Sequence, residues 1–178
     1  MSTAAAAGAG PEPAAVAALA ELVRARATLA TAESLTGGLI GELLTGVPGA
    51  SRSYVGGVIS YATRLKAALA DVPQPVLDAV GPVAPETAAA MATGVARRCA
   101  ADWGLAVTGV AGPEPQDGHP VGQVFVGLAQ PALGWVQVRE LRLDGDRAAI
   151  RAETAVTALA LLTEALRNAA RPAQRSRP

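Results

Sequence analysis

The chain has 178 residues, which is enough for one domain with a substantial core. Its 15 basic and 15 acidic residues cancel, and aromatic residues make up only 3%, so binding to nucleic acid or to an anionic membrane surface is not expected. The single cysteine, Cys99, excludes an internal disulfide and fits a cytoplasmic location. No apolar run approaches the ~18 residues of a membrane span, and no signal peptide is recognised.

Residues 1–13 are rich in Ala, Gly and Pro and are predicted to be a disordered tail, as is the basic end at 169–178. Residues 14–168 between them are predicted to form a single domain. Its first elements are a helix at 14–27 with one apolar face, a short buried strand at 28–33 and a helix at 39–44. A second strand is expected at 53–62, where Gly56 and Gly57 predict a bulge or a close backbone approach.

The second half of the chain begins with a short helix that carries Lys66 and could be capped by Thr63. One helical turn is expected at 76–79, and a clear helix at 85–101 opens on Pro85 and Glu86. Strands are predicted at 104–108, 121–129 and 135–143, the last two as a hairpin. Asp144 or Asp146 caps a final helix to 168, which is predicted to turn these residues inward: Ile150, Ala155, Leu159, Leu162 and Leu166.

This order of elements predicts an α/β fold, a three-layer α/β/α architecture with a mixed, mostly parallel sheet of about five strands and a C-terminal helix. Early strands that are separated by helices require parallel crossovers, whereas the late hairpin adds antiparallel strands. Ligands of such sheets bind beyond the carboxyl ends of the parallel strands. Three loops, at 34–38, 61–66 and 108–113, are therefore expected to meet there.

The loop at 34–38 reads Ser-Leu-Thr-Gly-Gly, and it joins a strand directly to a helix. Ser34 and Thr36 are candidate N-caps, and Gly37 and Gly38 let the backbone approach a ligand. Such a turn aims several N–H groups at one point, which suits an anion or the oxyanion of acyl transfer. The sequence leaves a second interpretation equally open, in which the hydroxyls only cap the helix and the glycines only turn the chain.

Lys66 is the only lysine among 15 basic residues. Arginine serves as well as lysine on a surface, but it cannot lose a proton near neutral pH, so a retained lysine points to a base. The alternative is a chance survivor on a helix surface. With one histidine, His119, and one cysteine, a His/Cys metal cluster is excluded and a Ser-His-Asp triad has no supporting context.

A hydroxyl nucleophile with a lysine base remains, and Ser34 and Lys66 each follow a strand, so neighbouring parallel strands would bring them together. Tyr61 could relay the proton or bind the substrate, or it could be a simple aromatic residue at the rim of the sheet. A phosphate group would suit the N–H groups at 37–38 and 108–109 and a guanidinium from Arg147 or Arg151. These two arginines lie four apart on one helical face, and the simpler interpretation is two solvated cations.

Five short motifs occur in a fixed order along the chain. They are Ala-Glu-Ser-Leu-Thr-Gly-Gly at 32–38, Val-Pro-Gly-Ala-Ser at 47–51, Gly-Gly-Val-Ile-Ser-Tyr at 56–61 with Lys66, Pro-Glu-Thr at 85–87, and Thr-Gly-Val-Ala-Gly-Pro at 108–113 with Pro-Val-Gly at 120–122. Together they resemble the CinA C-terminal domain family, the nicotinamide-nucleotide amidohydrolases, over roughly 14–166. The chain is similar to the stand-alone form, since no companion domain precedes Ala14.

The resemblance implies hydrolysis of the carboxamide of nicotinamide mononucleotide to nicotinate mononucleotide and ammonia, without a cofactor or a metal. It implies Ser34 as the nucleophile and Lys66 as the base, with Tyr61 beside them. The expected assembly is a homo-oligomer, a dimer or higher. The residues expected to bind the substrate are Glu33, Thr36, Gly37, Gly38, Thr108, Gly109 and Arg147.

Two other classes of function stay open from the sequence. One is a non-catalytic nucleotide-binding or regulatory module associated with competence or DNA damage, and the other is a structural oligomerisation domain built on Ala-rich helices. Lys66 separates the first of these from the enzyme, because a binding module would tolerate arginine there.

Overall fold

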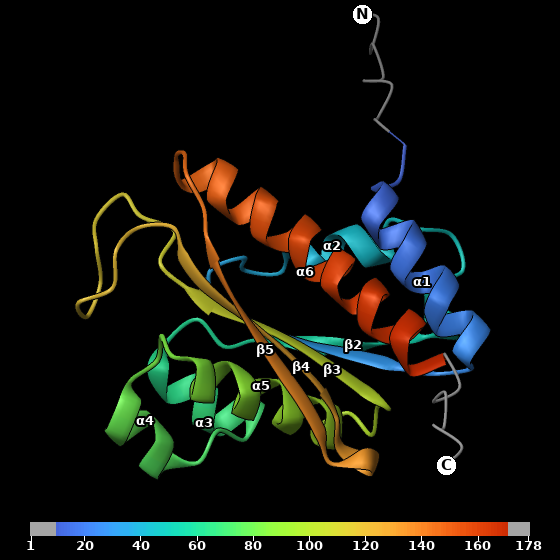
Figure 1. Cartoon of the computed structure of the whole chain (residues 1–178), viewed down its shortest axis with the longest axis horizontal. Helices are drawn as coiled ribbons and strands as arrows, with labels where there is room; N and C mark the ends of the chain where they lie inside the picture. The colour runs from blue at the N-terminus through green and yellow to red at the C-terminus, as the bar shows by residue number, and fades with distance from the viewer. Residues whose placement is uncertain (1–9, 171–178) are drawn as a thin grey trace, which may run out of the picture.

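A computed structural model gives the fold of the chain and describes residues 10–170. A five-stranded sheet is covered by helices on both faces, as Figure 1 shows, so the predicted α/β fold is confirmed. In chain order the helices and strands are α1 (Pro13–Ala25), β1 (Leu29–Glu33), α2 (Leu39–Thr45), β2 (Tyr54–Ile59), α3 (Thr63–Ala70), α4 (Gln74–Val80), α5 (Pro85–Arg98), β3 (Trp103–Gly109), β4 (Gln123–Gln130), β5 (Trp135–Arg142) and α6 (Arg147–Ala170), with short 3-10 turns at Ala50–Arg52 and Pro131–Leu133.

The strand order across the sheet is β2-β1-β3-β4-β5. Strand β1 pairs in parallel with β2 on one side and with β3 on the other, and β4 is antiparallel to both β3 and β5. All strands except β4 therefore point in the same direction. Because β1, β2 and β3 end at the same edge, the loops that follow them meet there, as the sequence predicts.

Helices α1, α2 and α6 cover one face of the sheet, and α3, α4 and α5 cover the other (Figure 1). The first face buries the larger of two main apolar clusters, which contains Leu22, Leu29, Leu105 and the inward side of α6. The second cluster is smaller and is built from residues such as Ala30, Ala32, Ala106, Met91 and Val95. The alternation of burial along β1 and β3 sends their odd-numbered residues to the first face and their even-numbered residues to the second.

Helix α5 lies unusually close to the sheet, because glycines on two strands face its backbone. A Cβ atom at Gly104 of β3 would lie 1.9 Å from the carbonyl oxygen of Ala92, and one at Gly127 of β4 would lie 2.3 Å from that of Ala88. No side chain fits in either space. Small residues on α5, such as Ala88 and Ala92, allow this close packing against the sheet.

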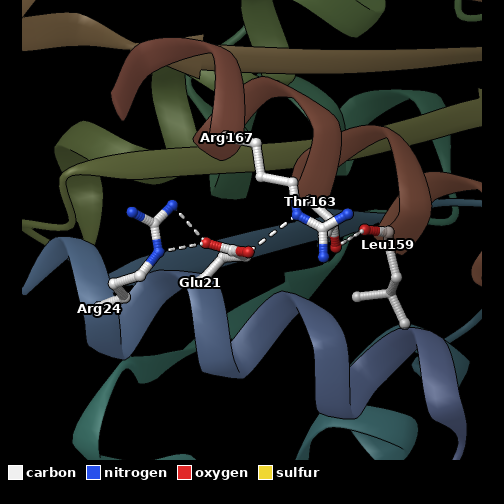
Figure 2. A network of polar contacts seen from close by, with 5 residues as sticks. All are labelled: Glu21, Arg24, Leu159, Thr163 and Arg167. Atoms are coloured by element: carbon white, nitrogen blue, oxygen red, sulfur yellow. Dashed lines mark hydrogen bonds and ion pairs between the residues drawn. The ribbon is translucent and has the colours of Figure 1, made fainter. Parts of the chain in front are cut away.

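Helix α6 is also tied to α1 by an ion-pair network at its C-terminal end (Figure 2). The Glu21 carboxylate accepts a bond from Arg24 Nε at 2.7 Å and one from Arg167 Nε at 2.8 Å. Next to it, Thr163 Oγ1 donates to the carbonyl oxygen of Leu159 at 2.9 Å, which keeps that hydroxyl within its own helix. The network lies far along α6 from Arg147, so it anchors the helix without taking part in the site.

Several predicted details differ from the structure. Residues 74–80 form a full helix rather than one turn, since Pro75 occupies its first turn and Leu77 is buried beneath it. Thr63 is the first residue of α3 and does not cap it, because its cap is Ala62 and no side chain caps the helix. Pro13 belongs to α1, and Ala169 and Ala170 belong to α6. The remainder of both predicted tails, 1–9 and 171–178, lies outside the described residues.

Two other predicted details are confirmed, the irregularity at Gly56 and Gly57 and the cap of the last helix. The register between β1 and β2 shifts where Leu29 pairs with Tyr54 and Ala30 with Gly56, and a Cβ atom at Gly57 would meet Thr31 Oγ1 at 2.2 Å. Asp146 caps α6 through Ala149 N–H at 2.8 Å. Within residues 10–170, no helix is both long and apolar enough to cross a membrane, and no group of three His, Cys, Asp or Glu side chains could hold a metal ion.

Candidate active site

A cavity of about 350 Å³ lies at the edge where β1, β2 and β3 end. Its walls come from the three loops that the sequence predicts to meet there, together with the segment before α5 and the first turn of α6. Ser34, Tyr61, Lys66, Thr108, Gly109 and Arg147 line it. Six of the ten residues predicted for the site are therefore brought together around one cavity.

Lys66 is a buried charged residue in the wall of this cavity, with 2% of its surface exposed. Its Nζ atom lies 3.0 Å from Ser34 Oγ, 2.9 Å from the carbonyl oxygen of Ser60 and 3.5 Å from that of Tyr61. The two carbonyl oxygens can only accept hydrogen bonds, so they hold two of the N–H groups of Nζ. The third direction points at Ser34 Oγ, and in the neutral amine it carries the lone pair.

Burial lowers the pKa of Lys66 from 10.5 to about 8. The cause is desolvation, which penalises the charged ammonium, and no carboxylate forms an ion pair with it in the described part of the chain. About a tenth of the molecules would then carry a neutral amine at pH 7. The alternative of a solvated lysine on a helix surface is therefore wrong, because Nζ is buried against Ser34 Oγ.

Glu33 organises the loop that carries Ser34, a role that the sequence analysis missed. Its buried carboxylate accepts bonds from Thr36 Oγ1 at 2.7 Å and from the N–H groups of Gly38, Ile40 and Gly41 at 2.8–3.1 Å. Neither Ser34 nor Thr36 caps helix α2, whose cap residue is Gly38 without a side-chain bond. The carboxylate at the end of β1 replaces a side-chain cap, because an anion is stabilised by the free N–H groups of a first helical turn.

The other predicted binding residues of this loop lie away from the cavity. Glu33, Thr36, Gly37 and Gly38 do not line it, and the Thr36 hydroxyl and the N–H of Gly38 both donate to the Glu33 carboxylate. The N–H of Gly37 donates to the carbonyl oxygen of Ser34 at 3.1 Å, and the N–H of Gly38 is held by Glu33. These two N–H groups are therefore already bonded, and their bonds stabilise the turn between β1 and α2.

Substitution Glu33→Ala is expected to lower the free energy of unfolding by about 3 kcal/mol, because it leaves three N–H groups and one hydroxyl without their common acceptor. Urea unfolding followed by circular dichroism measures the change. The matched control is Glu42→Ala in the same helix, since Glu42 is exposed and should change stability by no more than about 0.5 kcal/mol. Equal losses in the two variants would contradict the role of Glu33.

The two arginines of the first turns of α6 bind different loops. Arg151 donates from Nε to the carbonyl oxygen of Leu35 at 3.0 Å and from Nη2 to that of Thr36 at 2.7 Å. It therefore holds the backbone of the loop after Ser34. Arg147 donates to the carbonyl oxygen of Gly112 at 2.7 Å and to the Tyr61 hydroxyl at 3.0 Å. Arg147 lines the cavity and Arg151 does not, and neither is simply a solvated cation.

Tyr61 has two separate connections to the site. Its backbone oxygen is one of the acceptors around Lys66, whereas its phenol is 59% exposed and is held by Arg147. The phenol therefore lies at the mouth of the cavity, where it suits contact with a substrate better than a proton relay to the buried pair.

The comparison with known proteins decides the family. A model of the CinA C-terminal domain matches residues 12–166. The chain belongs to this family. A CinA-like protein from Frankia casuarinae is 52% identical over 145 residues, which are 82% of this chain and 33% of that protein. A CinA-like protein from Acidobacterium capsulatum is 44% identical over 141 residues, which are 79% of this chain and 34% of that protein.

Solved structures of CinA proteins have the same fold. A competence/damage inducible protein from Agrobacterium tumefaciens is 33% identical, with a TM-score of 0.81, and the match covers 90% of this chain and 99% of that one. A CinA superfamily protein from Klebsiella pneumoniae is 27% identical, with a TM-score of 0.82, and the match covers 88% and 99%. The chain spans about a third of the length of the curated CinA relatives given above.

Proposed function

We propose that this CinA domain is an amidohydrolase that deamidates nicotinamide mononucleotide to nicotinate mononucleotide and ammonia. The observation that carries the proposal is the 3.0 Å contact between Ser34 Oγ and the buried Nζ of Lys66 at the wall of a cavity. A serine hydroxyl is a weak nucleophile unless a neighbouring base takes its proton. A lysine whose pKa lies near 8 can be that base.

The reaction divides into two acyl-transfer steps. Neutral Lys66 takes the proton of Ser34 as Oγ attacks the carboxamide carbon, and the ammonium then gives a proton to the departing nitrogen, so that ammonia leaves and an acyl-serine remains. Lys66, neutral again, takes a proton from the water that attacks the acyl-serine. The acid is released and Ser34 recovers its proton.

The negative oxygen of each tetrahedral intermediate requires hydrogen-bond donors. The N–H groups of Leu35 and Thr36 follow the nucleophile directly, and neither has a hydrogen-bond partner among residues 10–170. Arg151 holds the carbonyl oxygen of Leu35, and in a trans peptide the N–H of Thr36 points the opposite way, away from the guanidinium. The N–H groups of Leu35 and Thr36, rather than the already bonded ones of Gly37 and Gly38, are proposed to stabilise the oxyanion.

Ammonia release during incubation with nicotinamide mononucleotide tests this function directly, with Ser34→Ala protein as the blank. The competing proposal is a nucleotide-binding module without catalysis. It would give tight binding of the mononucleotide, measured by calorimetry, and no ammonia above the blank. That result would remove the amidohydrolase.

We also propose that Arg147 recognises the phosphate of the nucleotide, since its guanidinium lines the cavity mouth. Arg147→Ala should lower kcat/KM for nicotinamide mononucleotide by about 10- to 100-fold, and it should leave the slower hydrolysis of nicotinamide riboside, which lacks the phosphate, nearly unchanged. The matched control is Arg142→Ala, because Arg142 pairs with Glu140 on β5 outside the cavity. An equal loss of kcat/KM with both substrates would mean that Arg147 only holds the loops in place and does not recognise the phosphate.

A further inference from the structure

Thr108 lies beside the nucleophile on the same face of the sheet. Glu33 of β1 is paired with Val107 of β3, and the N–H of Ser34 donates to the carbonyl oxygen of Val107 at 3.1 Å. The residues that follow this pair, Ser34 and Thr108, are therefore neighbours across the two strands. Both continue the even-numbered positions that face α3 and α5, which is the side from which Lys66 reaches Ser34, and both line the cavity.

The surroundings of Thr108 decide whether its hydroxyl donates or accepts a hydrogen bond. Its single proton is donated to the carbonyl oxygen of Pro82 at 2.7 Å, and a carbonyl oxygen cannot donate in return. Among residues 10–170, no donor is bonded to Oγ1. Thr108 is 1% exposed, and it lines the cavity. What the hydroxyl offers to a bound ligand is an acceptor and nothing else.

We propose that Thr108 Oγ1 accepts a hydrogen bond from the N–H of the substrate carboxamide, and that it thereby selects the amide against the carboxylate product. This inference rests on the proposed amidohydrolase function. A carboxamide presents two N–H donors, whereas the carboxylate that replaces it presents only lone pairs. The same oxygen that attracts the substrate therefore repels the product, which favours release of the acid after each turnover.

A purely structural role for Thr108 can be separated from this one by a second threonine. Thr87 Oγ1 donates to the carbonyl oxygen of Gly81 at 2.7 Å, so the two threonines hold neighbouring residues of the segment before α5. Thr87 is fully buried and does not line the cavity. If Thr108 served only to anchor this segment, removal of either hydroxyl would have the same consequence for ligands.

The test measures affinities by calorimetry in the Ser34→Ala background, where no turnover occurs. This protein should bind nicotinamide mononucleotide at least about tenfold more tightly than nicotinate mononucleotide. Adding Thr108→Val should weaken binding of the amide about tenfold and leave that of the acid unchanged or tighter, and Thr108→Ser should restore the preference. Thr87→Val should leave the preference as it was.

Two results would overturn the inference while leaving the proposed amidohydrolase function intact. One is equal affinity of the Ser34→Ala protein for nicotinamide mononucleotide and nicotinate mononucleotide. The other is an equal loss of affinity for both ligands when Thr108→Val is added. If Thr108→Val does not fold, the methyl ester of nicotinate mononucleotide decides. The ester keeps the carbonyl group but has no N–H, so Ser34→Ala protein should bind it at least about tenfold more weakly than the amide. Equal binding of ester and amide contradicts the inference, whereas a failure to bind any of the three ligands contradicts the proposed function itself.

Discussion

Substitution Lys66→Arg is expected to lower kcat/KM for nicotinamide mononucleotide by about 10³-fold or more, nearly as much as Lys66→Met. Arginine keeps the charge but cannot lose its proton in this range, so it cannot take the proton of Ser34. The arginine side chain is also larger than that of lysine, so ligand affinity must be measured separately from turnover. A lysine that acted only as a positive charge would instead be replaced well by arginine.

The pH profile of the unsubstituted enzyme provides the second readout. Because the pKa of Lys66 is about 8, kcat/KM should rise about tenfold per pH unit below that value and level off above it. The sign follows from the neutral amine being the active form and from deprotonation increasing with pH. The residual activity of Lys66→Met should lack this rise. A profile that is flat between about pH 6 and 9, or an active Lys66→Arg enzyme, would exclude Lys66 as the base.

Substitution Ser34→Ala is expected to abolish ammonia release, with a loss of at least about 10³-fold, because no other hydroxyl among residues 10–170 is bonded to Lys66 Nζ. The fold should be unaffected, since the Ser34 hydroxyl caps no helix and its loop is held by Glu33 and Arg151. Thermal unfolding followed by circular dichroism checks the fold, and calorimetry with nicotinamide mononucleotide checks that the cavity still binds the substrate.

The matched control for this loss is Ser53→Ala. Ser53 is a buried serine next to β2, away from the cavity, and its removal should leave turnover within about twofold of the unsubstituted enzyme. Mass spectrometry of the enzyme quenched during turnover should also detect the acyl-serine on Ser34. Near-normal ammonia release by Ser34→Ala would replace the serine nucleophile by direct attack of water on the amide.

The pairing of Ser34 with Lys66 could be predicted because it depends on few assumptions. Each residue follows a strand, and parallel neighbours end at the same edge of a sheet, so the order of elements alone places both near one point. The lone lysine in an arginine-rich chain then indicates which basic residue has a task that needs a removable proton. What the order of elements could not supply is the depth of burial, which lowers the pKa of Lys66.

The roles of Glu33, Arg147 and Arg151 could not be predicted in the same way. Glu33 and Ser34 are neighbours in the chain, but alternation along β1 sends their side chains to opposite faces, so one carboxylate shapes a loop while the adjacent hydroxyl meets a lysine. Arg147 and Arg151 are equivalent in sequence, four residues apart on one helix. Only the packing of α6 decides that Arg147 lines the cavity and that Arg151 bonds to the backbone of the loop after Ser34.

The sequence by itself thus determined the layers, the loops after the strands that line the cavity and the meeting of Ser34 with Lys66, because these depend on local periodicity and on chain connectivity. The tertiary structure decided which polar groups face the cavity and which are used up inside the protein. The physical reason is that a donor proton or an acceptor lone pair that is already hydrogen-bonded within the protein cannot bond to a ligand as well. Only the three-dimensional arrangement shows that the Glu33 carboxylate is fully occupied and that Thr108 Oγ1 still has lone pairs to offer.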